Sequence, residues 1–172
     1  MNVKPTVQEI ASMIDHSLLH PLLSDAELVS GFETAMQWNV ASVCVKPCSV
    51  SLCRKYLSDS KVKVCTVIGF PHGNNTIEMK KMESLQAIAE GAEELDLVVN
   101  IGKVMSNDWE YVWNELFSIQ EICVNSGAIL KVILETGVLP NDELKITLTK
   151  LCRELGIAFV KTSTGFAYMK PT

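Results

Sequence analysis

A lysine near the end of the chain stands where a β-strand should finish. Phe159 and Val160, two strand-favouring residues, come directly before Lys161. The residues after it carry hydroxyl groups and end in glycine: Thr162, Ser163, Thr164 and Gly165. Burial disfavours the charged form of an amine, and a neutral amine attacks carbonyl groups to form a Schiff base. The alternative is that Lys161 extends into solvent from a strand end and has no chemical role.

Other ionisable residues occupy comparable positions along the chain. The residues expected near the carboxyl ends of strands are Asp15, Lys46, Asp96, Lys131, Glu135 and Lys161. Because side chains alternate along a strand, one face should carry Lys161 with Phe159 and Ser163. By the same alternation Lys131 shares a face with Ile133 and Glu135, and Asp96 shares one with Glu94, Val98 and Asn100.

These faces could bring a carboxylate and two ammonium groups together inside a barrel. Two neighbouring lysines repel each other, which predicts that one of them loses its proton near neutral pH. The competing interpretation is a structural network of salt bridges without chemistry.

The elements that would position these residues follow a regular order. Strands are predicted over 14–19, 41–46, 62–70, 95–101 and 129–135 and from 159 onward. Helices are predicted over 7–14, from 24, and over 49–57, 75–92, 109–123 and 140–155. This alternation is typical of βαβ units with a parallel sheet. No G-x-G-x-x-G motif opens a helix, so an incomplete TIM (β/α) barrel of α/β class is favoured over a doubly wound sheet.

Composition limits the classes of function. The 172 residues are 48% hydrophobic, which suits one domain over residues 1–172. A net charge of −5 and a pI near 5.2 argue against partners such as nucleic acid or an anionic membrane surface. The first residues lack an apolar signal core and no apolar run is long enough to span a membrane, so we expect a cytoplasmic protein.

The six cysteines are scattered and form no C-x-x-C pair. We interpret them as free thiols in the core, with neither disulfides nor a metal site expected. His16 and His20 are four residues apart, but the leucines between them look like a strand end rather than a helix, which argues against a zinc pair.

Six segments together carry a resemblance to a known family. They are 14–19 (IDHSLL), 43–45 (VCV), 67–73 (VIGFPHG), 94–98 (ELDLV), 131–136 (KVILET) and 159–165 (FVKTSTG). They resemble, in order and over nearly the whole chain, the motifs of the deoxyribose-phosphate aldolases. The resemblance implies a TIM-barrel class I aldolase, a carbon–carbon lyase without metal or cofactor. Such enzymes reversibly cleave 2-deoxy-D-ribose 5-phosphate to D-glyceraldehyde 3-phosphate and acetaldehyde.

The resemblance also implies roles for individual residues. Lys161 would form the Schiff base, Asp96 would transfer protons, and Lys131 would be a further lysine lining the catalytic site. Substrate contacts would come from Asp15, Cys44, Thr162, Ser163, Thr164 and Gly165. The partners implied are a small phosphorylated sugar and further copies of the chain in a homo-oligomer.

The chain departs from the family pattern in its last part. A TIM barrel typically has eight strands and about 250 residues, and six strands are predicted here. We therefore expect the last two βα units, with a second catalytic lysine and a phosphate loop, to be missing. Lys170 and Pro171 do not replace that lysine motif, because no strand precedes them.

Two alternative functions remain open at this point. One is a catalytically impaired barrel fragment that acts only as an oligomeric or partner-binding protein. The other is a different Schiff-base barrel such as a transaldolase, which the segments 69–73 and 161–165 disfavour.

Overall fold

The structure, a computed structural model, describes residues 4–166, and that part of the chain contains one six-stranded parallel sheet. The expectations for residues 1–3, Lys170 and Pro171 lie outside the described residues. The strands are β1 (Asp15–Leu18), β2 (Ser42–Val45), β3 (Lys63–Ile68), β4 (Glu94–Val98), β5 (Ile129–Ile133) and β6 (Phe159–Lys161).

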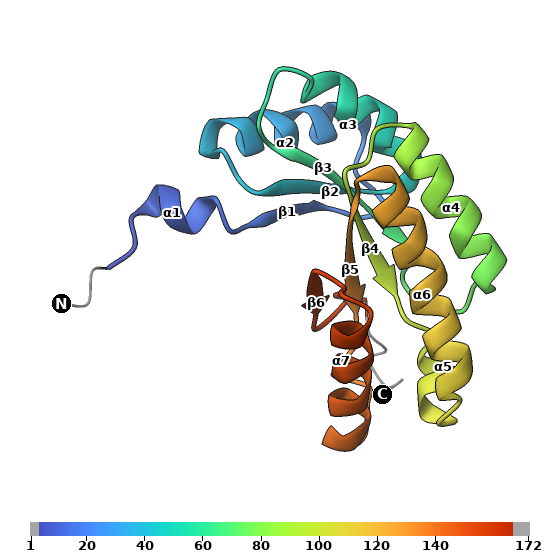
Figure 1. The fold of residues 1–172 in the computed structure, drawn as a ribbon. Coiled ribbons are helices and arrows are strands. Elements are labelled where there is room, and N and C mark those ends of the chain that lie inside the picture. The colour runs from blue at the N-terminus through green and yellow to red at the C-terminus, as the bar shows by residue number, and fades with distance from the viewer. Residues whose placement is uncertain (1–3, 167–172) are drawn as a thin grey trace.

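One helix precedes the first strand, and the other helices lie in the connections between strands. The helices are α1 (Val7–Ala11), α2 (Asp25–Trp38), the 3₁₀ helix η1 (Pro47–Ser49), α3 (Val50–Tyr56), α4 (Ile77–Ala89), α5 (Ile101–Met105), α6 (Trp109–Ser126) and α7 (Asp142–Glu154). Figure 1 shows α2, α3, α4, α6 and α7 along the outer side of the curved sheet, while α1 extends away from it. None of the helices in residues 4–166 is long and apolar enough to cross a membrane.

Local sequence explains where several helices begin. The side chains of Thr6 and Ser24 each accept a hydrogen bond from the backbone N–H three residues later. The carboxylates of Glu9 and Glu27 each accept one from the backbone N–H of the cap residue. These capping boxes satisfy backbone donors that a helix start would otherwise leave unpaired. Helix α6 buries a stripe at three- and four-residue spacing, as its sequence predicts.

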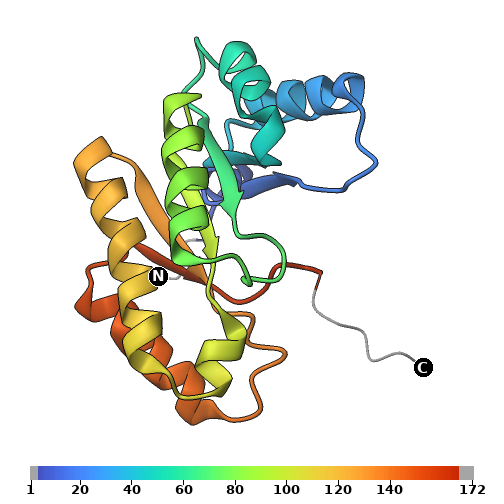
Figure 2. The same ribbon diagram turned by 90° about the vertical axis from the view of Figure 1, so that its right-hand side faces the viewer.

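The strands lie in the order β1-β2-β3-β4-β5-β6 and every neighbouring pair is parallel. In the described part of the chain β1 and β6 do not pair with each other, so the sheet curves without closing (Figures 1 and 2). The main core lies between the sheet and the outer helices. The expected α/β class and incomplete barrel are therefore confirmed as a half-barrel.

Two strand boundaries differ from the sequence expectation. Strand β4 ends at Val98 rather than at residue 101, because Asn100 caps a short helix and its side chain accepts from the N–H of Lys103 at 3.1 Å. Strand β5 ends at Ile133, and Glu135 has φ of 52°, in the left-handed region. The expected alternation of faces therefore fails for Asn100 and for Glu135.

The turn after β3 needs its glycines. Gly69 has φ of 63° and an added Cβ would lie 2.5 Å from Cε of Lys80. Gly73 has φ of 70° and an added Cβ would lie 2.1 Å from the carbonyl oxygen of Val99. Both positions therefore exclude larger side chains, which fixes the course of the loop that borders the inner side of the half-barrel.

Candidate active site

Strand register brings the predicted catalytic residues together. Asp96 of β4 is the partner of Lys131 of β5, and Ile133 is the partner of Lys161 of β6. Because Lys131 and Ile133 point to the same side of β5, all three charged side chains face the concave side of the sheet. The structure therefore gathers Asp96, Lys131 and Lys161 in one place, as the strand alternation predicts.

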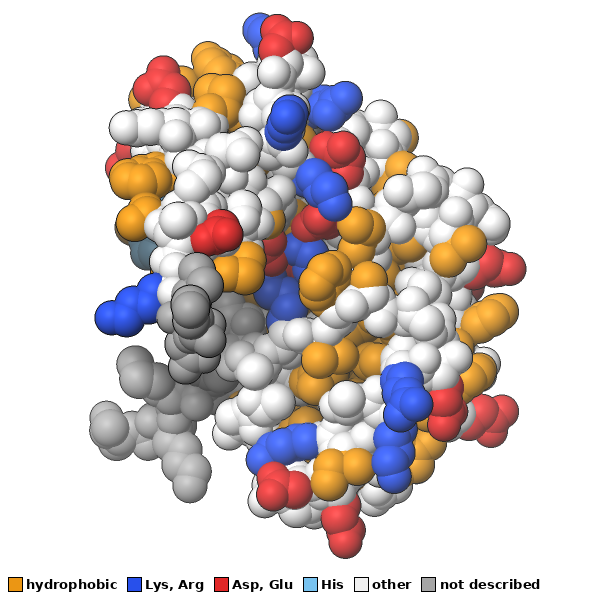
Figure 3. Space-filling view, turned by 60° about the vertical axis from the view of Figure 1, so that its left-hand side comes forward, with side chains coloured by type: hydrophobic (Ala, Val, Ile, Leu, Met, Phe, Trp, Pro, Cys, Tyr) orange, Lys and Arg blue, Asp and Glu red, His pale blue; other side chains and the backbone are white. Residues whose placement is uncertain are grey.

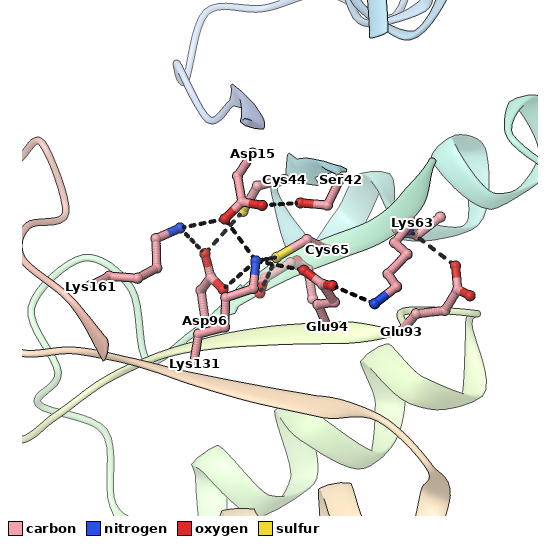
Figure 4. Close-up of polar contacts among 12 residues, drawn as sticks. Asp15, Ser42, Cys44, Lys63, Cys65, Glu93, Glu94, Asp96, Lys131 and Lys161 are labelled. Atoms are coloured by element: carbon pink, nitrogen blue, oxygen red, sulfur yellow. Dashed lines mark hydrogen bonds and ion pairs between the residues drawn. The ribbon is translucent and has the colours of Figure 1, made fainter. Parts of the chain in front are cut away.

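Each lysine of this cluster has more than one carboxylate partner (Figure 4). The Nζ of Lys161 contacts Oδ2 of Asp96 directly and lies 3.5 Å from Oδ2 of Asp15. The Nζ of Lys131 lies 2.5 Å from Glu94 Oε2, 2.7 Å from Asp15 Oδ2 and 3.7 Å from Asp96 Oδ1. Three carboxylates thus surround two ammonium groups.

The cluster lines a hollow on the open side of the half-barrel. The hollow has a volume of 540 Å³, and Asp15, Glu94, Lys131, Phe159 and Lys161 are among its lining residues. Figure 3 shows basic and acidic side chains meeting in a depression bordered by hydrophobic ones. The side chain of Lys161 is 28% exposed, whereas that of Lys131 is 5% exposed. Lys161 is therefore the more accessible amine.

The charges of the cluster correct one expectation. Burial lowers the pKa of Lys161, but the neighbouring Asp96 carboxylate and its hydrogen bond raise it, and the net shift is upward. Burial lowers the pKa of Lys131, but the nearby Cys65 and Asp96 and the hydrogen bonds to Asp15 and Glu94 raise it, and the net shift is upward. The prediction that repulsion between the lysines deprotonates one of them near neutral pH is therefore wrong for this chain, because neighbouring groups raise the pKa of both lysines.

Asp15 connects the first strand to this centre. Its Oδ1 accepts a hydrogen bond from the Ser42 hydroxyl at 2.7 Å, and its Oδ2 accepts one from Lys131 at 2.7 Å. Burial raises the pKa of Asp15, but these hydrogen bonds and the charges of Lys131 and Lys161 outweigh burial, so the net shift is downward. Asp15 is thus held as a carboxylate beside Lys161.

Two cysteines lie against the same charges. Sγ of Cys44 is 3.8 Å from Asp96 Oδ2, and Sγ of Cys65 is 4.0 Å from Lys131 Nζ. The two residues are direct partners across β2 and β3. Cys65 was not among the predicted site residues, since only the register of the two strands places it beside Cys44.

The hydroxyl-bearing residues after Lys161 have different surroundings. Thr162 and Ser163 are exposed, and the Thr162 carbonyl accepts from the N–H of Thr136 at 2.8 Å. Thr164 is buried, and its N–H and hydroxyl both donate to the Glu135 carboxylate. Thr164 therefore closes the β6 turn against Glu135.

Three further predicted positions lie apart from or beside the cluster. Gly165 follows Thr164 in the β6 turn with φ of 81°, a conformation that favours glycine. Lys46 donates hydrogen bonds to the carbonyl oxygens of His20 at 3.4 Å and Leu23 at 3.3 Å, and so stabilises the loop after β1. Asn100 caps α5 and contributes nothing to the charged cluster.

Comparisons with known proteins agree with this geometry. Six parallel strands with outer helices and charged groups on the inner face place the chain in the (β/α)-barrel class. A model of the DeoC/LacD family aldolases matches residues 10–172. The chain therefore belongs to the DeoC/LacD aldolase family.

Individual relatives carry a more specific name. The chain is 48% identical over 158 residues to the deoxyribose-phosphate aldolase of Rhodopirellula baltica, covering 92% of this chain and 65% of that protein. It is 44% identical over 160 residues to that of Clostridium perfringens strain SM101, covering 93% and 70%. The resemblance to deoxyribose-phosphate aldolases is thus confirmed, and the chain spans about two thirds of the length of these relatives.

A solved structure shows the same fold. The deoxyribose phosphate aldolase from Aeropyrum pernix, described as having a unique tetrameric structure, superposes with a TM-score of 0.87 at 29% identity. The match covers 94% of this chain and 67% of that one. The remaining third of that chain has no counterpart among the matched residues.

Proposed function

We propose that this chain carries the Schiff-base centre of a deoxyribose-phosphate aldolase, with Lys161 as nucleophile. The observation that carries the proposal is the contact between the accessible amine of Lys161 and the buried carboxylate of Asp96. A protonated amine cannot attack a carbonyl, and its pKa is raised here. Asp96 can accept the proton that Lys161 must lose, since it is already its hydrogen-bond acceptor.

The reaction then follows from ordinary imine chemistry. The neutral amine adds to the aldehyde carbon of the sugar phosphate, and loss of water gives a protonated imine. The bond between the second and third carbons breaks as its electron pair moves toward the iminium nitrogen. The proton of the third-carbon hydroxyl passes to Asp96, directly or through water, and glyceraldehyde 3-phosphate leaves. Protonation and hydrolysis of the two-carbon enamine release acetaldehyde and restore Lys161.

The other charged residues support this assignment without replacing it. Lys131 is held by Asp15, Glu94 and Asp96 and is nearly inaccessible. Its ammonium group lies 3.7 Å from Asp96 Oδ1, so it can help to hold that side chain in position beside Lys161. Cys44 and Asp15 border the amine and could contact the substrate, whereas Thr162 and Ser163 could reach a substrate hydroxyl from the turn.

Borohydride trapping tests the nucleophile directly. The chain is incubated with acetaldehyde, which has no phosphate group and therefore needs no phosphate-binding site. The mixture is then reduced with borohydride, and the protein is digested for mass spectrometry. We expect an adduct on Lys161, loss of that adduct in Lys161→Met, and an unchanged yield in Lys46→Arg, whose lysine lies outside the cluster. An adduct of equal yield in the Lys161→Met variant, or none in the wild type, would refute the Schiff-base proposal.

A second candidate function is that of a partner-binding or self-associating barrel fragment. The outer edge of β6, which pairs with no strand among residues 4–166, favours it, since Phe159 is 55% exposed and Val160 is 46% exposed there. Copies of the chain could cover this edge in a homo-oligomer, and the deoxyribose phosphate aldolase from Aeropyrum pernix is described as tetrameric. The unit over residues 1–172 would then act as one domain.

Light scattering after size exclusion tests this second function. We expect the wild type to associate and Val160→Lys to shift it toward the monomer, because a charge on a strand edge blocks edge pairing. Val124→Lys is the matched control, since Val124 is 65% exposed on α6, away from the edge. A monomeric wild type, or equal effects of both variants, would contradict association through β6.

A further inference from the structure

We propose that Cys44, Cys65 and Asp96 form a binding site for a single thiophilic divalent cation such as Zn²⁺. One sulfur of each cysteine and one carboxylate oxygen all lie within 4.8 Å of one another, and all three residues are buried. Zn²⁺ bonds to thiolate sulfur at about 2.3 Å and to carboxylate oxygen at about 2.0–2.2 Å in tetrahedral sites. An ion placed among the three atoms would reach them with small side-chain adjustments.

The parallel sheet assembles this site from separate strands. Cys44 and Cys65 are register partners on β2 and β3, and Val67 of β3 pairs with Asp96 of β4. The two cysteines pack with Val67 in a small cluster separate from the core under the helices. Their sulfurs therefore lie on the inner side of the half-barrel. Sequence spacing cannot reveal the pair, because 21 residues separate the cysteines.

One carboxylate oxygen of Asp96, Oδ1, is available to coordinate a cation. Among the described residues, its Oδ1 is the one buried side-chain oxygen or nitrogen without a hydrogen-bond donor, although Lys131 Nζ lies 3.7 Å away. Asp96 is 1% exposed, so no bulk water compensates this atom. A cation coordinated by Oδ1 would supply the missing interaction, whereas Oδ2, which lies 3.8 Å from Cys44 Sγ, already accepts from Lys161.

The neighbouring lysines need not leave when a cation binds. Lys131 keeps Asp15 at 2.7 Å and Glu94 at 2.5 Å, and Lys161 keeps Asp15 at 3.5 Å. Each lysine thus retains a carboxylate after Asp96 turns to the ion. Binding also leaves the local charge unchanged, since one Zn²⁺ replaces the two protons released by the two thiols.

A bound ion would inhibit the reaction of Lys161 with an aldehyde. This consequence rests on the function proposed above. Asp96 cannot coordinate a cation and accept the proton of Lys161 at the same time. Occupancy should therefore block imine formation, so the site would make the aldolase centre sensitive to thiophilic cations. Metal binding itself can be measured without any aldolase activity.

Cadmium titration of the whole chain tests the site, because bound thiolates give Cd²⁺ a near-ultraviolet charge-transfer absorption. We expect one saturable Cd²⁺ with the absorption of two thiolates, displaced by Zn²⁺. Cys44→Ser and Cys65→Ser should each weaken binding by at least about tenfold and halve the absorption. Cys48→Ser is the matched control, since Cys48 is exposed and outside the cluster, and should bind like the wild type.

A measurement on the wild type alone removes dependence on variants that fold poorly. Zn²⁺ added in weak buffer should release about two protons per ion at neutral pH, one from each coordinating thiol. Release of no protons, absence of saturable absorption, or wild-type affinity in Cys65→Ser would overturn the proposal. Metal binding with the expected stoichiometry but no loss of borohydride trapping would leave the site standing and refute only its inhibitory role. Trapping that fails even without metal would count against the Schiff-base proposal alone.

Discussion

Two lysines of this protein, Lys80, which is buried, and Lys161, which is partly exposed, have pKa values shifted in opposite directions. Lys80 of α4 is fully buried and donates to Glu115 of α6 at 2.6 Å, and to the carbonyl oxygens of Gly73 and Val98 at 2.8 Å each. Burial lowers the pKa of Lys80, and Glu115 opposes that shift only in part. Lys161 is partly exposed among several carboxylates, and its pKa is raised.

The comparison shows that a lowered pKa does not make a lysine a nucleophile. Lys80 is the more easily neutralised amine, yet no aldehyde can reach it between α4 and α6. Burial also raises the pKa of Glu115, whose second oxygen accepts from the N–H of Asn100 at 2.9 Å. The pair of Lys80 and Glu115 thus fixes the loop after β3 and the end of β4. In the pair of Lys161 and Asp96, by contrast, the lysine is partly exposed to solvent.

Breaking the buried ion pair between Lys80 and Glu115 should have the largest effect on the stability of the protein. Lys80→Met leaves the Glu115 carboxylate buried without its cation, which should cost about 3–5 kcal/mol of unfolding free energy. Urea unfolding followed by circular dichroism measures this loss. The double variant Lys80→Met/Glu115→Leu should recover most of it, because no unpaired charge then remains.

A surface pair provides the control for that measurement. Lys81 and Glu78 form a contact of 3.0 Å on the exposed face of the same helix. Lys81→Met should change the unfolding free energy by less than about 1 kcal/mol. Equal losses in the Lys80 and Lys81 variants would show that burial of the Lys80 pair contributes nothing special.

The raised pKa of Lys161 should appear in the pH dependence of the rate of borohydride trapping. Below that pKa the neutral fraction of Lys161 rises about tenfold per pH unit, so borohydride trapping should accelerate about hundredfold from pH 7 to pH 9. Initial rates at fixed acetaldehyde concentration measure this profile. A rate that levels off below pH 8 would show that the amine is less basic than its carboxylate surroundings imply.

Replacing Lys161 should have the smallest effect on the stability of the protein. Lys161→Met should cost about 1 kcal/mol or less at neutral pH, since Lys161 is partly exposed and Lys131 still compensates Asp96. Because the folded pKa of Lys161 is raised above 10.5, its contribution is present below pH 10.5 and is lost as the pH rises through the folded value. Denaturant unfolding at pH 8 and at increasingly alkaline pH should show the two proteins converge. A loss comparable to that of Lys80→Met would contradict the distinction between the two centres.

Much of the architecture was predictable from local sequence. Alternating apolar segments and helix caps located all six strands, and strand alternation identified Asp96, Lys131 and Lys161 as residues of one face. Asn100 and Glu135 were misplaced, because a helix cap and a left-handed backbone residue end the alternation earlier than composition suggests. Lys80 was missed although it shares the inward spacing of Ser84 and Ala87 on α4.

The sequence by itself determined that Lys161 ends a strand, because that depends on residues near each other in the chain. It also determined the aldolase family, because each of six short segments is recognisable from its own residues. The tertiary structure alone decided the charge balance around that lysine. Asp15 meets it from β1 and Asp96 meets it from β4, and the parallel register of the strands sets these distances. Register likewise placed Cys65 beside Cys44. Electrostatic interactions depend on separation in space, which no spacing along the chain specifies.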